Sequence, residues 1–445
     1  MNERIQARTL KGFRDFLPAA MIPREKLIET ARQVYRSFGF SPIDTPALEH
    51  LEILIGKGSD ETDRQLYRFE DHGGRPVGMR FDLTVPLARF AAQHIQTLGI
   101  PFERYQVGTV WRGENTQRGR YREFMQCDFD TIGSLSVAAD IETGAVIHEL
   151  LVALGFERFT IRLNNREVLN GLLEKLGLSD KATAVLRSLD KLAKIGPEKV
   201  AAEMQTTAGL SSEQANQLME LSSLQGQHDE LLTSLQPLVA GSETGEAGLA
   251  RLAEILSGLR AAGVPESRVQ LDVSIARGLD YYTGAIYETF LDDLEGIGSV
   301  CSGGRYDNLA ELYTKQQLPG IGASLGLDRL LAAMDELGMI ESVGTPADVM
   351  ITCFSMDGLE RYLQIASQLR SAGLAVELYP EARKLGQQLK YADQRGYPLV
   401  IIAGPDELAD NECQVKQMQS GDSCRVSLAN EAQALVDELR RQLAD

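Results

Sequence analysis

Apolar positions recur at helical spacing near the start of the chain. In residues 25–38, EKLIETARQVYRSF, one helical face collects these side chains: Leu27, Ile28, Ala31, Val34, Tyr35 and Phe38. Pro23 stands just before them, near the entry of a helix, where a missing N–H costs little. The pattern predicts an amphipathic helix that opens the first domain.

Beyond this helix the apolar pattern shortens to a period of two. Gly and Pro separate the alternating segments SPIDTPAL, GGRPVGMRFDLT, FERYQVGTVWR and REFMQCDFDTIG. Short alternating segments of this kind favour antiparallel strands and hairpins over a repeated βαβ unit. We therefore predict an antiparallel sheet in this part of the chain.

Residues 104–131 form the clearest hairpin, with RYQVGTVWR going out, GENTQRGRY as the loop and REFMQCDFDT returning. Period two places one set of side chains on a single face of the returning strand: Arg122, Phe124, Gln126, Asp128 and Asp130. An antiparallel sheet can simply show such a polar face to water. Alternatively, its guanidinium, ring, amide and carboxylate groups suit phosphate, base and ammonium in turn.

The pattern changes again at about residues 170–265, which are rich in Ala, Leu, Ser and Gln at helical spacing, with a capping-box start from Ser211 to Gln214. We interpret this segment as a helical insertion. A strand-like pattern resumes at RVQLDVSIARG and continues to the glycine-rich GIGASLGLDRLLAAM. The segment GMIESVGTPAD follows, and we interpret it as a linker. The last hundred residues alternate strand and helix, from ADVMITCF to the closing helix NEAQALVDELRRQLAD, which predicts a small α/β domain.

Composition limits the class of protein. The chain has 445 residues, of which 43% are hydrophobic, enough for two or three domains. Its apolar runs are too short to cross a bilayer, and MNERIQARTLKGF has no apolar stretch of the secretory kind, so we expect a cytoplasmic protein without a membrane partner. The five cysteines show no CxxC and the five histidines no HExxH pair, which argues against a disulfide framework and against zinc.

The formal net charge of −18 means that a nucleic acid has to be held by local positive patches. One patch lies in residues 104–122, where a single acid, Glu114, accompanies five arginines: Arg104, Arg112, Arg118, Arg120 and Arg122. A stretch of this kind is ordinarily a solvated surface. Its placement on a hairpin with a patterned polar face favours a functional role.

A glycine-rich stretch at residues 320–334 leads into an amphipathic helix. The spacing GxGxxxG of Gly320, Gly322 and Gly326 is a weak dinucleotide signature, and no GxxxxGK[ST] occurs, so any nucleotide is held without a P-loop. Arg329 falls on the first helical turn, from where it can reach back over the sheet. The alternative is tight helix-on-sheet packing with Arg329 in a surface ion pair.

Four segments, taken in order, resemble one family: RYQVGTVWRGENTQRGRYREFMQCDFD, ARGLDYYTG, CSGGRYDNL and GIGASLGLDRLL. The first and last resemble motifs 2 and 3 of the class II aminoacyl-tRNA synthetases. The middle two, together with the N-terminal KGFRDFLP, are similar to signatures of the histidyl-tRNA synthetases within that class. With the C-terminal domain included, the resemblance covers nearly the whole chain.

The resemblance implies an α+β fold, with a class II antiparallel sheet flanked by helices. The implied domains are a catalytic core at 1–169 and 266–338, a helical insertion at 170–265 and an α/β anticodon-binding domain at 346–445. A homodimer formed partly through FGFSPIDTPALEHLE is also implied. The implied reaction is ATP-dependent ligation of L-histidine to its tRNA through a histidyl-adenylate, with Mg²⁺ accompanying the ATP.

For ATP, the resemblance implies that Arg112 holds the α-phosphate together with the substrate carboxylate and that Phe124 stacks on adenine. Glu114 and Arg120 are implied to belong to the same nucleotide site. Arg329 resembles the motif 3 arginine that clamps ATP from the other side.

For the amino acid, the resemblance implies a pocket in which the corner 82–84 and Gln126 receive the α-amino group and Asp130 and Tyr282 bracket the imidazole. The full implied set is Asp82, Leu83, Thr84, Arg112, Gln126, Asp130, Arg277, Tyr281 and Tyr282. Neutral imidazole offers one donor and one acceptor, so a carboxylate and a phenol placed across it can reject isosteres that cannot hydrogen-bond.

Arg277 and Arg112 are the predicted catalytic residues. Attack of a carboxylate on the α-phosphate builds negative charge on the equatorial oxygens and on the departing pyrophosphate. A guanidinium fixed beside the Gly278 turn can meet that charge without reorganising. The general base of the transfer to tRNA stays open, and a phosphate oxygen of the adenylate could serve.

Three segments depart from the common bacterial members and resemble the eukaryotic and archaeal branch: the corner RFDLT, the loop RGENTQRGR, and Asp130 in place of a frequent glutamate. The shorter side chains of Asp82 and Asp130 need a shifted ligand or a water. The loop usually meets the tRNA acceptor end, so how this chain reads that end stays open.

Two other functions remain open at this level. A catalytically silent paralogue serves as the regulatory subunit of ATP phosphoribosyltransferase, but it typically lacks the anticodon-binding domain. A generic ATP-dependent ligase that recognises histidine without tRNA draws support from the acidic C-terminal domain. Anticodon recognition, however, works mainly through stacking and base edges, so the domain's net charge decides little.

Overall fold

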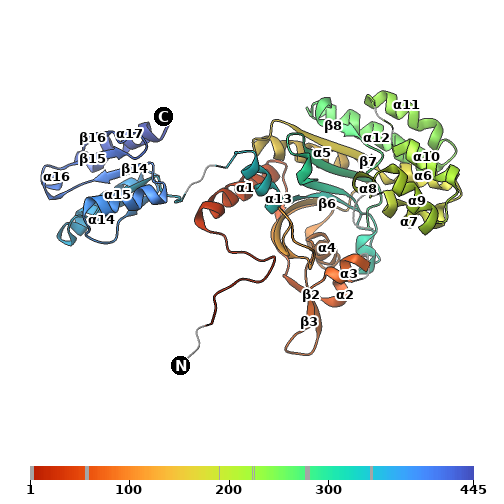
Figure 1. The fold of residues 1–445 in the computed structure, drawn as a ribbon, viewed down its shortest axis with the longest axis horizontal. Helices are drawn as coiled ribbons and strands as arrows, with labels where there is room; N and C mark the ends of the chain where they lie inside the picture. The colour runs from red at the N-terminus through yellow and green to blue at the C-terminus, as the bar shows by residue number, and fades with distance from the viewer. Residues whose placement is uncertain are drawn as a thin grey trace. The chain divides into compact units, whose positions relative to one another are not determined.

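The computed structural model describes residues 5–55, 60–189, 191–222, 224, 226–275, 281–340 and 344–444. The chain divides into two compact units, shown as ribbons in Figure 1. The first unit holds Met1–Arg14 and Leu27–Met339, and the second holds Asp15–Lys26 and Ile340–Asp445. Within the described ranges, no helix combines the length and the apolar character that crossing a membrane requires.

The first unit is built on an eight-stranded sheet in the order β1-β5-β6-β11-β10-β9-β7-β8. The strands are β1 (Ser41–Pro42), β5 (Phe102–Trp111), β6 (Glu123–Ile132), β7 (Phe159–Asn165), β8 (Val269–Leu271), β9 (Ala285–Leu291), β10 (Cys301–Arg305) and β11 (Gly320–Gly326). The pairings from β5 through to β7 are antiparallel. The predicted antiparallel sheet is confirmed, except that the outermost pairs, β1 with β5 and β7 with β8, are parallel.

A three-stranded antiparallel sheet, β2-β4-β3, accompanies the large one. Its strands are β2 (Leu48–His50), β3 (Arg68–Glu70) and β4 (Pro76–Met79). The helices of this region are α1 (Pro18–Ser37), α2 (Leu51–Leu54), α3 (Asp60–Gln65), α4 (Thr84–Leu98), α5 (Val137–Ala153) and α13 (Leu327–Glu336). The 3₁₀ turns are η1 (Ser179–Lys181), η2 (Glu266–Arg268), η3 (Glu295–Ile297) and η4 (Leu309–Leu312).

Helices fill the chain between β7 and β8 and gather on one side of the sheet (Figure 1). They are α6 (Arg166–Lys175), α7 (Ala182–Leu189), α8 (Leu192–Ile195), α9 (Pro197–Thr207), α10 (Ser212–Ser222), α11 (His228–Val239) and α12 (Glu243–Ala261). The predicted capping box forms at α10, where the Gln214 N–H donates to Ser211 Oγ at 3.1 Å and the Ser211 N–H donates to Gln214 Oε1 at 2.9 Å. Helix α12 packs against α5, which itself lies on β7, β10 and β11.

The apolar face of β6 packs on helix α1. The Tyr35 ring lies 5.2 Å from the Phe129 ring, and the Tyr35 hydroxyl donates to the Cys127 carbonyl at 3.0 Å. Cys127 and Phe129 are almost fully buried. Because alternate residues of a strand point to opposite faces, this packing turns Gln126, Asp128 and Asp130 to the other side of the sheet.

Helix α1 begins at Pro18 rather than at residue 25, and Pro23 lies inside it rather than near its entry. Residues 18–20 are exposed. The start of the helix therefore lies outside the buried apolar stripe on which the predicted start depended.

The second unit carries a five-stranded sheet in the order β13-β12-β14-β15-β16. Its elements are β12 (Val349–Ile351), η5 (Met356–Gly358), α14 (Leu359–Ser371), β13 (Val376–Leu378), α15 (Leu385–Arg395), β14 (Leu399–Ile402), α16 (Pro405–Ala409), β15 (Glu412–Gln417), β16 (Ser423–Ser427) and α17 (Ala429–Ala444). The predicted α/β character is confirmed. The antiparallel hairpin β15–β16 was not predicted, although Cys413 and Val415 alternate with polar residues there.

Candidate active site

A cavity of about 320 Å³ opens on the polar face of β6, in the first unit. Strands β6, β9, β10 and β11, the corner before α4 and the first turn of α13 contribute to its lining. The predicted site residues that line it are Asp82, Thr84, Arg112, Glu114, Arg120, Phe124, Gln126, Asp130, Tyr281, Tyr282 and Arg329. The polar face of the returning strand therefore faces a cavity, and not open water.

Two of the predicted residues are not in this lining. Leu83 occupies the N-cap position of α4, and its side chain is fully buried in the protein interior. It therefore contributes to the corner before α4 through its backbone. Arg277 lies outside the residues that the structure describes, and its predicted role stays a prediction.

The hairpin loop gives the cavity a cationic and aromatic rim. The Arg112 guanidinium lies 5.2 Å from the centroid of the Phe124 ring, and its Nε donates to the Phe81 carbonyl at 2.8 Å. The Arg112 N–H donates to the Arg122 carbonyl at 2.9 Å, which closes the base of the loop. Arg112 is therefore held beside a flat ring on the wall of the cavity.

The tip of the loop lies on the first turn of α13. A Cβ added to Gly119 would come within 3.3 Å of the Arg329 Cα, and Arg118 Nη1 lies 2.9 Å from Glu336 Oε2 on the same helix. Arg329 occupies the first helical turn, as predicted, and its Nη1 donates to the Ser299 carbonyl. The hairpin loop and the start of α13 thus meet at the rim of one cavity.

Asp328, which the sequence did not single out, holds this junction together. Its Oδ2 accepts from the Met125 N–H of β6 at 2.7 Å, and its Oδ1 pairs with the Arg14 guanidinium. Asp328 also lines the cavity and is 2% exposed. It fixes the end of α13 against the strand that carries the site.

The corner before α4 presents a buried carboxylate. Asp82 Oδ1 accepts from the Val85 N–H at 3.0 Å, so the side chain caps the first turn of α4 although Leu83 is formally the cap. Burial raises the pKa of Asp82 to about 6, against the Val85 N–H and the Arg112 charge, which lower it. Arg80 secures the corner, because its Nε donates to the Thr109 carbonyl at 2.9 Å.

Asp130, on the same polar face of β6, contacts two buried side chains. It stands opposite Arg104 in the register of β5 and β6, and Arg104 Nη2 lies 2.5 Å from Asp130 Oδ2. The Tyr306 hydroxyl donates to Asp130 Oδ1. Burial raises the pKa of Asp130, and the Arg104 charge and the Tyr306 hydrogen bond oppose that rise. Arg104 is fully buried, so it does not belong to the phosphate-facing patch in which the sequence placed it.

Asp128 lies between Gln126 and Asp130 on the same face. Burial raises its pKa to about 7, with the Arg104 charge opposing and the Asp130 charge adding to the rise. Gln126 Nε2 donates to Ser324 Oγ at 2.6 Å, across β11. The inner part of the cavity is therefore rich in carboxylates, whereas its rim is rich in arginine.

Three tyrosines close the inner part. The Tyr281 and Tyr282 rings lie 5.2 Å apart, and the Tyr281 and Tyr306 rings 5.9 Å apart, both edge to face. Burial raises the pKa of all three phenols, so they stay neutral at ordinary pH and can donate hydrogen bonds. The Tyr281 hydroxyl points to Asp82 Oδ2 at 3.5 Å.

Glycines of β10 and β11 make room for these side chains. A Cβ on Gly322 would come within 2.3 Å of Asp130 Oδ1, and one on Gly304 within 3.1 Å of the Tyr282 ring. The glycine-rich segment thus begins as strand β11, where Gly322 admits the Asp130 carboxylate, and Gly304 of β10 makes room for the Tyr282 ring. This is a close-approach role, and it explains the glycines without a dinucleotide fold.

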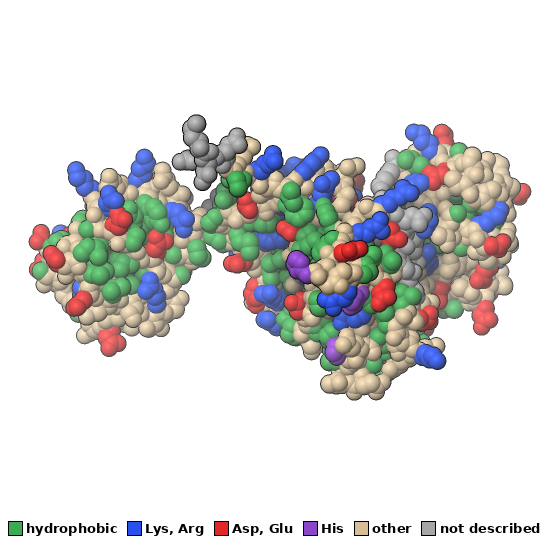
Figure 2. Space-filling model, turned by 90° about the horizontal axis from the view of Figure 1, so that it is seen from below, with side chains coloured by type: hydrophobic (Ala, Val, Ile, Leu, Met, Phe, Trp, Pro, Cys, Tyr) green, Lys and Arg blue, Asp and Glu red, His purple; other side chains and the backbone are tan. Residues whose placement is uncertain are grey.

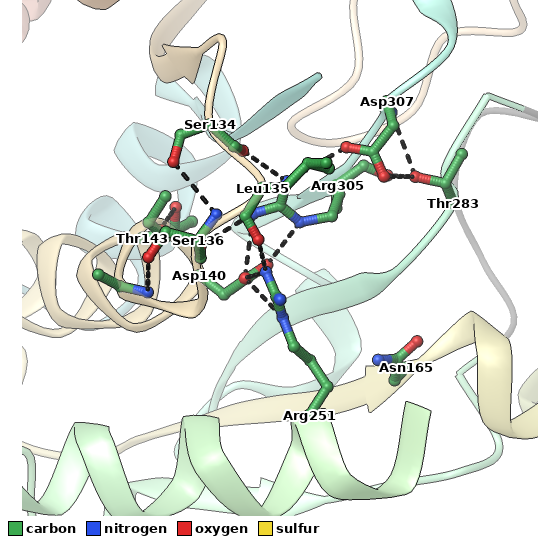
Figure 3. Close-up of polar contacts among 12 residues, drawn as sticks. Ser134, Leu135, Ser136, Asp140, Thr143, Asn165, Arg251, Thr283, Arg305 and Asp307 are labelled. Atoms are coloured by element: carbon green, nitrogen blue, oxygen red, sulfur yellow. Dashed lines mark hydrogen bonds and ion pairs between the residues drawn. The ribbon is translucent and has the colours of Figure 1, made fainter. Parts of the chain in front are cut away.

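A polar network ties β10 to helix α5 (Figure 3). Arg305 donates from Nε to Asp140 Oδ1 at 2.9 Å, from Nη2 to Asp140 Oδ2 at 3.0 Å and from Nη1 to the Ser134 carbonyl at 2.9 Å. Arg251 of α12 pairs with the same Asp140 from the other side. Asp140 thereby joins β10, the turn after β6 and a helix of the inserted segment.

The network also reaches the segment before β9 that carries Tyr281 and Tyr282. The Thr283 N–H donates to the Arg305 carbonyl at 2.7 Å, and its hydroxyl donates to Asp307 Oδ2 at 2.9 Å. Thr283 follows Tyr281 and Tyr282 directly in the chain. Arg305 is therefore a positioning residue for one wall of the cavity.

Sequence reasoning assigned no role to several residues that shape the site. They are Asp140, Glu288, Arg305, Tyr306 and Asp328, while Arg104 was placed only in the arginine patch and Asp128 only on the polar face. For Asp128 the period-two pattern contained the signal. Arg305 and Tyr306 lie in the GGRYD signature, while the partners of Arg104 and Asp140 follow from strand register and packing between distant segments.

The comparisons with known proteins agree with this geometry. A family model described as Histidyl-tRNA synthetase matches residues 12–330, and one described as Anticodon binding domain matches residues 348–438. A sheet of this topology with a nucleotide-sized cavity, followed by an anticodon-binding domain, defines a class II aminoacyl-tRNA synthetase, a ligase that acts on tRNA.

Individual relatives narrow the class. The chain is 62% identical over 437 residues to a curated histidine–tRNA ligase of Rhodopirellula baltica, covering 98% of this chain and 99% of that protein. It superposes with a TM-score of 0.89, at 37% identity, on the crystal structure of histidyl-tRNA synthetase from Nostoc sp. PCC 7120, covering 99% of this chain and 100% of that one. The chain belongs to the histidyl-tRNA synthetase family.

A further structure bears on the regulatory alternative. An ATP phosphoribosyltransferase regulatory subunit/histidyl-tRNA synthetase from Bacillus halodurans superposes with a TM-score of 0.75 over 90% of this chain and 99% of that one. At 23% identity this likeness shows the shared fold alone. Two findings separate this chain from the silent paralogue: the match to an anticodon-binding domain, and 62% identity to a histidine–tRNA ligase over 98% of the chain.

Proposed function

We propose that this chain, a histidine–tRNA ligase, activates L-histidine with ATP and then transfers the histidyl group to its tRNA. The observation that carries the proposal is the division of one cavity into an arginine-rich rim and a carboxylate-rich inner part. The rim suits the phosphates and the substrate carboxylate, and the inner part suits the ammonium and the imidazole. The two reactants would meet where the halves join.

ATP is proposed to lie on the hairpin side of the cavity. Arg112 binds the α-phosphate and the histidine carboxylate, and Phe124, whose ring already lies against the Arg112 guanidinium, stacks on adenine. Glu114 and Arg120 belong to the same nucleotide site, and Arg329 clamps the nucleotide from α13. Mg²⁺ enters with the phosphates, which supply most of its ligands. The proposal includes no zinc.

Histidine is proposed to lie in the inner part. The corner of Asp82 and Thr84, with Leu83 shaping its backbone, receives the α-amino group together with Gln126. Asp130 and Tyr282 bracket the imidazole, and Tyr281 lies beside them. The role proposed for Arg277, which lies outside the described residues, is to stabilise the charge that develops at the reacting phosphate.

The tRNA is proposed to bind both units. A second cavity of about 730 Å³ adjoins the first, since Arg120 and Glu288 line both, and helices α7 and α8 of the inserted segment contribute Leu189 and Leu192. We propose a catalytic core at 1–169 and 266–338, a helical insertion at 170–265 that meets the acceptor stem, and an anticodon-binding domain at 346–445.

A cytoplasmic homodimer is part of the proposal. Leu48 on β2 and Phe69 on β3 are 45% and 49% exposed, large values for such side chains. Figure 2 shows hydrophobic side chains between the charged ones on one face of the molecule. Apolar side chains on the small sheet next to FGFSPIDTPALEHLE support dimer formation through that segment.

The proposal is tested by ATP–pyrophosphate exchange with each amino acid, followed by charging of purified tRNA. Exchange that depends on histidine, with charging, supports the proposal. Exchange without charging would indicate a ligase that does not use tRNA, and the absence of both activities would indicate a regulatory protein. Arg277→His is expected to lose most adenylation and still bind histidine. An active variant would remove Arg277 from the mechanism.

A further inference from the structure

One buried carboxylate of the cavity has no role in the proposed function. Asp128 lies on β6 between Gln126 and Asp130, lines the cavity with them and is 1% exposed. A carboxylate buried without partners is costly. The groups that contact its two oxygens therefore indicate what it does.

Its neighbour Asp130 contacts protein groups at both carboxylate oxygens, through a hydrogen bond at Oδ1 and an ion pair at Oδ2. Asp130 Oδ1 accepts from the Tyr306 hydroxyl, and Asp130 Oδ2 lies 2.5 Å from Arg104 Nη2. Gly322 leaves only enough space for the carboxylate in this position, since a Cβ there would lie 2.3 Å from Asp130 Oδ1. Asp130 is held in place on three sides.

Asp128 stands opposite Ser324 in the register of β6 and β11, and hydrogen bonding with the Ser324 side chain lowers the pKa of Asp128 against the effect of burial. Asp128 Oδ1 is buried and has no hydrogen-bond partner within the described part of the chain. A buried acceptor of this kind, on the wall of a cavity, is suited to a donor that arrives with the ligand.

The charge around Asp128 selects the kind of donor. Asp82, Asp128 and Asp130 all line the cavity, and the fully buried guanidinium among them, Arg104, is paired with Asp130. A neutral or cationic N–H group is the complement of this surface. Histidine carries two such groups, the ammonium and the imidazole.

Position distinguishes between the two groups. Asp82 stands at the α4 corner, where the ammonium is proposed to bind. Tyr282, proposed to lie against the imidazole, lines the cavity with Asp128 and Asp130, and after burial the charges of these two carboxylates are the main causes that raise the pKa of its phenol. The ring bound against Tyr282 therefore lies next to Asp128 as well.

We propose that Asp128 is a further substrate-binding residue, whose Oδ1 accepts a hydrogen bond from a ring N–H of the bound histidine. The inference rests on the proposed function, because it takes histidine as the ligand. Asp130 has a shorter side chain than glutamate and already contacts Arg104 and Tyr306. It then contributes shape and negative charge to the pocket beside the ring. Asp128 supplies the acceptor that faces the ring.

The test compares L-histidine with its two ring-N-methylated forms, Nπ-methyl- and Nτ-methyl-L-histidine, on the wild type and on Asp128→Ala. Binding is measured by calorimetry without ATP, and the KM values for histidine and ATP by pyrophosphate exchange. We expect Asp128→Ala to weaken histidine binding about 10–100-fold, the range for a hydrogen bond to a charged group. The methylated form that lacks the donated N–H should bind wild type and variant alike, within about threefold.

The KM for ATP is the check on folding, since the nucleotide is proposed to bind at the rim. Asp128→Asn, which keeps the shape of the side chain, is the second variant and should weaken histidine binding about tenfold. Wild type without histidine-dependent exchange would overturn the proposed function. Two results would overturn the inference alone, provided that the wild type shows histidine-dependent exchange. Either the variants bind histidine as tightly as the wild type, or they lose affinity equally for all three ligands.

Discussion

Arg104 and Asp130 stand opposite each other on β5 and β6, with Arg104 Nη2 2.5 Å from Asp130 Oδ2. Both side chains are buried, Arg104 fully and Asp130 at 3% exposure. A buried pair gains little over an apolar pair of the same shape, but loss of one partner leaves an uncompensated charge. This pair therefore acts as a support that keeps a carboxylate in the proposed histidine pocket.

We expect Arg104→Met to lower the free energy of unfolding by about 3–5 kcal/mol and to raise the KM for histidine. Urea denaturation and pyrophosphate exchange measure the two effects. The matched control is Arg118→Met, which breaks the exposed pair with Glu336 and should cost less than about 1 kcal/mol. Equal losses in the two variants would contradict a special role for the buried pair.

Gly322 offers a test of close approach. A Cβ at this position would lie 2.3 Å from Asp130 Oδ1 and 2.2 Å from the Phe129 carbonyl, so Gly322→Ala has to displace a carboxylate and a backbone. We expect the variant to lose most histidine activation, with the KM for histidine raised at least about tenfold.

The control for this change lies on the same strand. Gly326→Ala meets its nearest neighbours at ordinary contact distances, 3.8 Å from the Val300 carbonyl and 3.9 Å from the Arg329 Cβ. It should keep near wild-type kinetics for histidine. If the two alanine variants behaved alike, the tight fit at Asp130 would not govern the pocket.

The sequence predicted what depends on neighbours along the chain. Period two placed Phe124, Gln126, Asp128 and Asp130 on one face, and the structure turns that face to a cavity. Helical spacing likewise placed Arg329 on the first turn of α13. Such patterns are local, so a single sequence contains them.

The partners of these residues depend on the tertiary fold. Arg104 was grouped with the loop arginines because it is near them in the chain, whereas strand register buries it against Asp130. Asp140 and Arg305 are separated by 165 positions and meet only because α5 packs on β10. No spacing rule in one sequence predicts such a pair.

The raised pKa of Asp128 predicts a pH dependence of stability. Its pKa in the folded protein, about 7, lies above the ordinary aspartate value, so between the two values the native state binds more protons than the unfolded state. The free energy of unfolding therefore falls as the pH rises through this window. The groups that face Asp128 and titrate or carry charge with it are Asp82, Asp130 and Arg104.

We expect the ligand-free wild type to lose roughly 2–3 kcal/mol relative to Asp128→Asn between about pH 5 and pH 8. Urea denaturation of both proteins at several pH values measures the difference. The contribution of the other titrating groups is common to both proteins, so it cancels in that difference. A difference that stays constant with pH, or grows in favour of wild type at high pH, would show that Asp128 titrates normally.

Arg305 supplies the last prediction, because it joins the cavity wall to α5. Its guanidinium makes a two-point contact with Asp140, its carbonyl accepts from the Thr283 N–H at 2.7 Å, and Tyr306 follows it in the chain. Lysine cannot reproduce the planar two-point contact. We expect Arg305→Lys to lower the free energy of unfolding by about 2–4 kcal/mol and to raise the KM for histidine more than the KM for ATP.

Arg251→Gln is the matched control, because Arg251 contacts the same Asp140 but its side chain is 26% exposed and belongs to α12. With Arg305 still in place, Asp140 stays paired, so this variant should lose only about 1 kcal/mol and keep its KM for histidine. Kinetics for both substrates, with urea denaturation of each variant, separate a positioning role from general stability. If Arg305→Lys raised both KM values equally, Arg305 would stabilise the fold without positioning Tyr281 and Tyr282 in the cavity wall.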